Sequence, residues 1–209
     1  MIDLYTWSTP NGRKVSIALE EMGLAYNVHP INIGKDEQFA PDFLKIAPNN
    51  RIPAIVDQDN GMHLMESGAI LLYLAEKCGK FLPTDGEAKW RTIEWLMWQM
   101  GGQGPMIGQV HHFSHYNQGK APYAEERYLK EANRLYKVLN TRLGDADFVG
   151  GDYSIADMAI WPWVSRFERH LVDLNTYPNV KRWYLAIAER PAVHRGYGVP
   201  TAEDVPIPS

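Results

Sequence analysis

The sequence is almost free of cysteine, with one such residue, Cys78, among 209. One cysteine cannot close an intrachain disulfide, and secreted chains of this size usually carry several. Residues 1–7 contain no basic segment and no long apolar stretch, so we expect no signal peptide. These absences favour the reducing cytoplasm as the compartment and argue against a disulfide-stapled secreted fold.

Long apolar runs and an excess of positive charge are also missing. The longest strongly apolar run, residues 69–75, is far shorter than the ~20 residues that span a bilayer. The formal net charge is -4 and no lysine- or arginine-rich run occurs, so we expect neither nucleic acid nor a membrane as partner. The 45% of hydrophobic and 22% of charged residues are typical of a globular protein.

The first part of the chain mixes short strands and helices. Alternating apolar and polar residues predict strands, whereas apolar residues at helical spacing predict helices. In chain order we expect a strand, a helix, a strand, a helix, two strands and a helix, at residues 2–7, 13–22, 26–33, 39–46, 52–57, 62–65 and 66–79. This order indicates an α/β domain.

The second part, beyond a linker at residues 80–86, is predicted to be entirely helical. Ser154 and Asp157 have the spacing of a helix-capping box, with aspartate where glutamate is commoner. The expected helices cover residues 88–101, 105–116, 123–143, 154 onward and 178–190, with a glycine-weakened bend between the first two. We therefore expect two domains, residues 1–83 and 84–209, with a loose tail from about residue 197.

The turn at residues 9–12, between the first strand and the first helix, is the first candidate for chemistry. Helix N-termini present unpaired N–H groups and favour an anion such as a thiolate. A dithiol redox protein would hold Cys-x-x-Cys in this loop, but this turn has no cysteine, so a reacting thiol must arrive with a ligand. Thr9 and Asn11 can donate hydrogen bonds to that thiol; the alternative is that they only cap the helix.

Ile52-Pro53 and Glu66-Ser67 are two further candidates. A proline that opens a strand after a turn is a candidate cis peptide, which would turn the Ile52 backbone outward to pair with an extended peptide; an ordinary trans proline is the alternative. Ser67 at a helix start suits a carboxylate, and Glu66 suits an ammonium. The pair could thus hold the head group of an α-amino acid, with plain capping as the alternative.

In their order and spacing, these segments resemble the glutathione transferase superfamily, and within it the nu class, which includes bacterial disulfide-bond oxidoreductases. The resemblance extends over nearly the whole chain. The motifs that carry it lie at residues 9–12, 38–39, 46–57, 66–75, 99–106, 127–128 and 154–157.

The resemblance implies the glutathione transferase fold, an α/β thioredoxin-like N-terminal domain and an all-α C-terminal helical domain, in a homodimer. It implies that Thr9 and Asn11 contact the glutathione sulfur and that Ile52 pairs with the tripeptide backbone through cis-Pro53. The other implied contacts are Glu66 and Ser67 at the γ-glutamyl end, Gln38 and Arg51 near the glycine end, and Arg127 reaching a glutathione across the dimer.

We predict from these residues a glutathione-dependent disulfide-bond oxidoreductase in which two bound glutathione molecules supply both sulfurs. Glutathione, reduced or oxidised, is the expected co-substrate, and a small or mixed disulfide is the other substrate. The same activated thiol would give weak glutathione transferase activity. The alternatives are a conventional detoxifying transferase and a non-enzymatic, glutathione-binding regulatory protein.

Five further residues have side chains that could take part in chemistry: Tyr5, Ser8, Cys78, His111 and His115. Tyr5 and Ser8 are alternative thiol-activating groups, because other transferase classes use a tyrosine or serine hydroxyl for this purpose. Cys78, near the end of a helix, is expected to be an inert packing residue. His111 and His115 lie one helical turn apart, as in zinc helices, but no further ligand set accompanies them, so no metal is expected.

Overall fold

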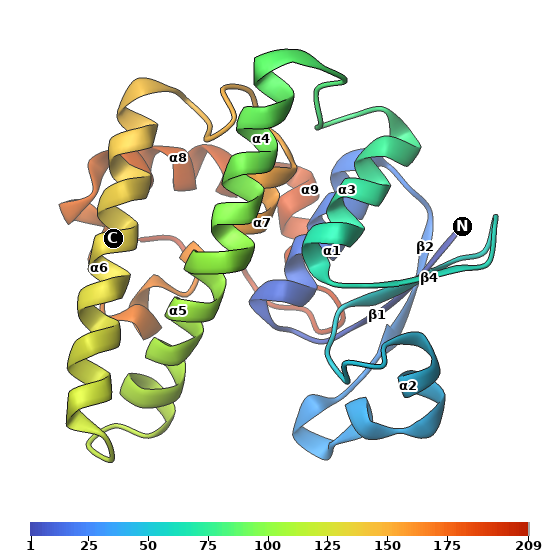
Figure 1. Ribbon diagram of the computed structural model, residues 1–209, viewed down its shortest axis with the longest axis horizontal. Coiled ribbons are helices and arrows are strands. Elements are labelled where there is room, and N and C mark those ends of the chain that lie inside the picture. The colour runs from blue at the N-terminus through green and yellow to red at the C-terminus, as the bar shows by residue number, and fades with distance from the viewer. Residues whose placement is uncertain (209) are drawn as a thin grey trace. The chain divides into compact units, whose positions relative to one another are not determined.

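The computed structural model describes residues 1–208 and divides into two compact units (Figure 1). The first unit combines residues 1–82 with 188–205, and the second combines residues 83–187 with the chain from 206. The sequence placed a single division at residue 83. The structure differs because the chain returns to the first unit after residue 187.

A four-stranded sheet forms the centre of the first unit, in the order β2-β1-β3-β4. β2 runs parallel to β1, whereas β3 runs antiparallel to both β1 and β4. β4 has the predicted bounds, whereas the other three strands are shorter than predicted but lie in the predicted segments. The strands are β1 (Ile2–Thr6), β2 (Tyr26–Pro30), β3 (Ala54–Asp57) and β4 (Met62–Met65).

Among the described residues, four α-helices and two 3₁₀ turns complete this unit. α1 packs against α3, and α9 packs against α1, so the three helices lie side by side (Figure 1). Their bounds are α1 (Pro10–Met22), α2 (Pro41–Ile46), α3 (Ser67–Cys78) and α9 (Pro191–Tyr197), with 3₁₀ turns η1 (Ile33–Lys35) and η2 (Glu37–Phe39) between β2 and α2. The α1–α9 approach is close enough that a Cβ on Gly196 would lie 2.5 Å from Ile17 Cα.

The tail is held against the first unit, which differs from the loose extension expected from about residue 197. The Arg13 side chain is completely buried, and its Nη2 donates to Glu203 Oε2 at 2.6 Å. Its guanidinium also lies 3.6 Å from the centre of the Tyr197 ring. Two residues beyond Glu203, Val205 is 6% exposed. A buried arginine and an apolar side chain therefore anchor this segment.

Among its described residues, the second unit has helices and no strand longer than the single β-bridge between Phe148 and Gly151, which confirms the predicted fold class. α7 is buried along its whole length, and the capping box at its start is present as predicted, because Ser154 N–H donates to Asp157 Oδ2 at 3.0 Å. The helices are α4 (Gly86–Trp98), α5 (Gly104–Val110), α6 (Pro122–Asp145), α7 (Ile155–Val164) and α8 (Pro178–Ala188).

Short non-α segments connect these helices. π-helical η3 (Gln99–Gln103) joins α4 to α5 without a break in the helical path, where the sequence predicted a bend at glycines. The remaining segments are π-helical η4 (His111–Tyr116) and the 3₁₀ turns η5 (Phe167–His170) and η6 (Leu174–Thr176). Within residues 1–208, no helix has the length and apolar character needed to cross a membrane.

Candidate functional site

The register of the sheet brings the three candidate segments to one edge. Tyr5 pairs with Ala54, and Ala54 pairs with Met65, so β1 and β4 end at the same edge at which β3 begins. The segments that follow β1, precede β3 and follow β4 therefore emerge together. These are residues 7–12, 50–53 and 66–67, the positions that the sequence had singled out.

Thr9 is the N-cap of α1. Its backbone is extended, and its Oγ1 accepts a hydrogen bond from Gly12 N–H at 3.1 Å. A hydroxyl that accepts one hydrogen bond can still donate its own hydrogen. Capping and contact with a ligand sulfur are thus compatible for Thr9. Asn11, in the first turn of the same helix, is half-buried.

Gly12 is required by the tightness of this turn. A Cβ at this position would lie 2.2 Å from the Trp7 carbonyl oxygen and 2.5 Å from Thr6 Oγ1. Both distances are far below van der Waals contact, so the start of α1 can approach the end of β1 only where no side chain intervenes. Glycine thereby sets the position of Thr9 and Asn11 against the sheet edge.

The peptide bond between Ile52 and Pro53 is cis, which settles the alternative that the sequence left open. Pro53 is buried, and the pairing with β1 begins one residue later, at Ala54. The Ile52 side chain packs against a buried cluster of Phe43, Ala47 and Ala54. The side chain of Ile52 is therefore fixed by packing, whereas its backbone precedes the residues of β3 that pair with β1.

Glu66 and Ser67 form the start of α3. Glu66 is exposed and adopts a left-handed backbone, with φ of 70°, which is unusual for a residue other than glycine. Asn49 Nδ2 donates to Glu66 Oε1 at 3.5 Å, which links the loop before Pro53 to this helix start. Ser67, in contrast, is only 4% exposed.

Lys14 lies beneath this helix start and was missed in the sequence. Its side chain is 1% exposed, and its Nζ donates to Ser67 Oγ at 3.2 Å. Burial lowers the pKa of Lys14 to about 7, and the charge of Glu66 opposes that shift. The sequence does contain a pattern that indicates the burial of Lys14. Lys14 precedes Ala18 by four residues and so lies on the apolar face of the helix.

Gln38 and Arg51 are placed on the segments that flank this edge. Gln38, in η2, donates from Nε2 to Asp36 Oδ1 at 3.4 Å, while its Oε1 is buried without a hydrogen-bond partner among the described residues. Arg51 directly precedes Ile52 and is exposed. Among the described residues, no hydrogen bond or ion pair joins the side chain of Gln38 or Arg51 to another candidate residue, so their assignment to a glycine carboxylate stays a prediction.

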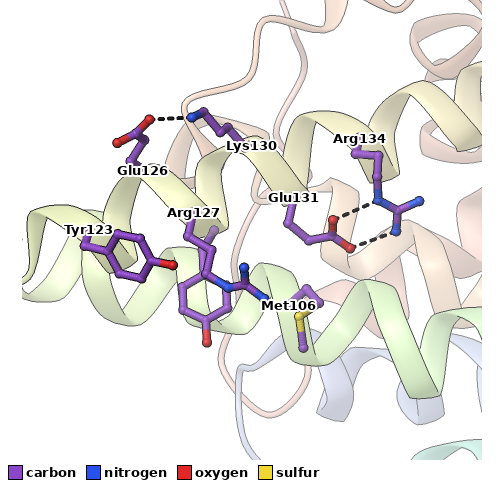
Figure 2. Close-up of a pocket in the computed structure, with 8 residues that line it drawn as sticks. Met106, Tyr123, Glu126, Arg127, Lys130, Glu131 and Arg134 are labelled. Atoms are coloured by element: carbon purple, nitrogen blue, oxygen red, sulfur yellow. Dashed lines mark hydrogen bonds and ion pairs between the residues drawn. The ribbon is translucent and has the colours of Figure 1, made fainter.

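Arg127 lines a pocket of about 540 Å³ in the second unit. Two other cations there are neutralised, because Lys130 pairs with Glu126 and Arg134 Nη2 lies 2.7 Å from Glu131 Oε1. Figure 2 shows these two pairs and Arg127 outside both. Within residues 1–208, Arg127 makes no hydrogen bond or ion pair. The pocket is lined by Met106, Tyr123, Glu126, Arg127, Tyr128, Lys130, Glu131 and Arg134.

The alternative thiol-activating groups have other environments. The Tyr5 ring stacks on His29 with 4.6 Å between ring centres, and burial raises the pKa of its hydroxyl, which therefore stays protonated at neutral pH. Ser8 is half-buried. Cys78 is half-buried at the last turn of α3, where its Sγ lies 3.7 Å from the Ala75 carbonyl oxygen, in agreement with a packing role.

The histidines at 111 and 115 do not share a site. His111 points into the interior of the second unit and stacks on Trp163 with 5.7 Å between ring centres, whereas His115 is exposed. Within residues 1–208, no group of three or more His, Cys, Asp and Glu side chains is placed to hold a metal ion.

Comparison with known proteins gives matches over both units. Residues 1–76 match the family model described as glutathione S-transferase, N-terminal domain, and residues 122–186 match that of the C-terminal domain. The disulfide-bond oxidoreductase YfcG of Escherichia coli is 53% identical over 198 residues, which cover 92% of each chain.

Two solved structures from Pseudomonas have the same fold. A glutathione transferase from Pseudomonas putida, with one glutathione disulfide bound per subunit, has a TM-score of 0.90 and 44% identity over 95% of this chain and 91% of its own. A glutathione transferase family member from Pseudomonas fluorescens, with two glutathione bound, has a TM-score of 0.89 and 43% identity over 95% and 93% of the two chains.

Proposed function

Because this chain belongs to the glutathione S-transferase family, we propose that it is a glutathione-dependent disulfide-bond oxidoreductase. The observation that carries the proposal is the start of α1. Thr9 and Asn11 present hydrogen-bonding groups where a thiolate is stabilised, yet the chain's one cysteine, Cys78, lies at the far end of α3. The reactive sulfur must then come from bound glutathione.

The sheet edge offers a partner for most groups of glutathione, an extended tripeptide with two carboxylates, one ammonium and one thiol. Thr9 and Asn11 hold the thiolate sulfur, and the backbone of Ile52 pairs with that of the tripeptide. Ser67 and the N–H groups at the start of α3 bind the γ-glutamyl carboxylate, since helix N-termini attract anions. Glu66 holds the ammonium, and Gln38 and Arg51 lie near the glycine carboxylate.

The reaction uses two glutathione molecules. The thiolate of the first attacks one sulfur of the substrate disulfide, forms a mixed disulfide and releases the other substrate sulfur as a thiolate. The second glutathione thiolate attacks the glutathione sulfur of that mixed disulfide, which releases the remaining substrate thiolate and oxidised glutathione. The Pseudomonas fluorescens relative binds two glutathione molecules, which supports a site of this capacity.

Activation requires only a modest shift of the glutathione thiol. A free cysteine thiol has a pKa of about 8.5, so lowering it by about one to two units makes the thiolate abundant at neutral pH. Hydrogen bonds from Thr9 and Asn11, together with the positive end of the α1 dipole, act in that direction. The same thiolate gives weak conjugation of glutathione to electrophiles.

A second copy of the chain is part of the proposal. Trp90 and Met97, seven residues apart and hence on one face of α4, are 68% and 47% exposed. Such an apolar stripe suits a homodimer interface. Arg127, which acts on Glu131 electrostatically but makes no ion pair with it, then binds a carboxylate of glutathione held by the other subunit.

The proposed chemistry belongs in the cytoplasm, because it consumes reduced glutathione, which that compartment maintains. The physiological substrate is a small disulfide or a mixed disulfide with glutathione.

Two assays on one preparation test the function. Turnover of a small mixed disulfide with reduced glutathione is measured beside conjugation of chlorodinitrobenzene, and we expect disulfide turnover to be the faster. Conjugation without disulfide turnover would instead identify a detoxifying transferase. Calorimetric binding of glutathione with neither activity would identify a regulatory binding protein, and absence of binding at millimolar glutathione would reject all three.

A further inference from the structure

A buried lysine lies directly under the proposed carboxylate site. Lys14 belongs to the second turn of α1, and Ser67 is the first residue of α3, so their hydrogen bond joins α1 to α3. Both side chains are nearly inaccessible, at 1% and 4% exposed. A lysine is almost never fully buried unless it is paired, so the burial of Lys14 depends on partners such as Ser67.

Charged groups on α1, α3 and α9 surround Lys14 at different distances and exposures. From α3, Glu66 acts on Lys14, but the Glu66 side chain is exposed and therefore screened by water. On α9, Arg195 Nε donates to Glu20 near the far end of α1, and His194 is exposed. Arg13, beside Lys14 on α1, is engaged by Glu203. An anion bound at Ser67 would add negative charge next to the Lys14 ammonium, because Lys14 Nζ donates to Ser67 Oγ.

The hydrogen bond also determines which way the Ser67 hydroxyl can act. A charged lysine has three N–H donors and no acceptor, so Ser67 Oγ must accept from it and its own hydrogen is directed elsewhere. A neutral lysine amine has a lone pair and can accept that hydrogen instead. The protonated form of Lys14 is therefore the one that leaves Ser67 able to donate to a carboxylate.

We propose that Lys14 is a positioning residue for glutathione: its ammonium directs the Ser67 hydroxyl toward the γ-glutamyl carboxylate, and binding of that carboxylate draws a proton from solution onto Lys14. This inference rests on the proposed function, because it assumes that the carboxylate binds at Ser67. Glutathione affinity is thereby coupled to pH through a group that never touches the ligand.

The acid–base character of Lys14 supports this coupling. With a pKa lowered by burial to about 7, Lys14 is partly neutral in the free protein near neutral pH. An anion within a few ångströms of an ammonium raises its pKa, so the bound state holds the proton that the free state lacks. Affinity then falls as pH rises from 7 until it passes the pKa of Lys14 in the complex.

Calorimetry with S-methylglutathione measures this proton directly. The methyl group removes the thiol, so ionisation of glutathione sulfur does not contribute. Titration of the full-length protein at pH 7.5 in phosphate and in Tris, whose ionisation enthalpies differ widely, gives the number of protons taken up on binding. We expect net uptake of a fraction of one proton per site, because part of Lys14 is neutral in the free protein.

Three variants assign the proton to its residue. Lys14→Met keeps the length of the side chain without its charge, and we expect a roughly tenfold to hundredfold weaker Kd and no proton uptake, since a hydrogen bond to a charged group is lost. Lys14→Arg is always charged and should bind without uptake and without pH dependence between pH 6.5 and 8.5. Lys45→Met, at an exposed position of α2, should have the same dissociation constant and the same proton uptake as the parent.

The outcomes separate this inference from the proposed function. Binding of S-methylglutathione to the parent without proton uptake overturns the role of Lys14, whatever the variants do, and leaves the function intact. Equal uptake by the parent and a folded Lys14→Met variant also overturns it, because the ligand's own ammonium is common to both. No binding by the parent, tested also with reduced and oxidised glutathione, rejects the proposed function itself.

Discussion

The Nε2 atoms of His170 and His111 lie 2.8 Å apart in the interior of the second unit. Two ring nitrogens at this distance share a single hydrogen, so one ring donates and the other accepts. His170 Nδ1 lies at the same distance, 2.8 Å, from the Tyr136 hydroxyl, which extends the chain of hydrogen bonds. Burial lowers the pKa of both histidines, that of His111 to about 4, and both rings stay neutral in the folded protein at physiological pH.

This pair predicts acid sensitivity of the folded state. As pH falls below 6.5, histidines in the unfolded chain take up protons, whereas His111 does not do so until about pH 4. The free energy of unfolding should therefore decrease across that window. His111→Gln should reduce the dependence, and exposed His112→Gln should not. Urea midpoints between pH 7 and 4 measure this, and identical slopes for the parent and His111→Gln would contradict it.

Asn11→Ala should impair disulfide turnover by roughly 10- to 100-fold, because a hydrogen bond to a charged sulfur is worth about 1.5–3 kcal/mol. Cys78→Ala should have little effect, since its thiol packs near the end of α3. Steady-state rates with a mixed disulfide and reduced glutathione test the pair. Comparable activity of Asn11→Ala and the parent would remove Asn11 from the catalytic assignment.

Arg127→Ala should raise the dissociation constant of glutathione by roughly 10-fold, as expected for loss of a charge-assisted hydrogen bond. Arg134→Ala is the matched control in the same pocket, because Arg134 is already paired with Glu131. Calorimetric dissociation constants for oxidised glutathione compare the two. An unchanged value for Arg127→Ala would exclude this residue from the site.

Gly12→Ala should destabilise the first unit by about 1–3 kcal/mol, the usual penalty for forcing an extra methyl group into a packed position. The new Cβ would clash with the Trp7 carbonyl oxygen at 2.2 Å. Gly102→Ala places a methyl group in a helical segment with nothing within 4 Å and should be neutral or slightly stabilising. Denaturant unfolding of both variants measures the difference, and equal stabilities would show that the turn can relax.

Glu203→Ala should also destabilise the folded chain, by about 1–3 kcal/mol, because it leaves the buried Arg13 guanidinium without its carboxylate. Neighbouring Asp204→Ala, whose side chain is exposed, should be close to neutral. Thermal unfolding and proteolysis of the C-terminal segment would report the change. If the two variants behaved alike, the tail would not be anchored through Arg13.

Much of the site could be predicted because its parts are local. The turn at Thr9, the proline that opens β3 and the serine at the start of α3 each have a recognisable residue pattern at a helix or strand end. Their assembly at one edge follows from strand register, which local patterns do not contain. The cis bond at Pro53 was left open for the same reason, since the residues around it allow both isomers.

The amino-acid sequence by itself determined the order of strands and helices, the change from an α/β unit to a helical one, the family and the cysteine-free turn at residues 9–12. Periodicity and capping residues involve only a few neighbouring positions, so they can be recognised from the sequence alone. Only the tertiary structure decided that Lys14 meets Ser67, that Arg13 meets Glu203 and that His111 meets His170. These partners are 53, 190 and 59 residues apart, and their contact depends on the packing of whole elements.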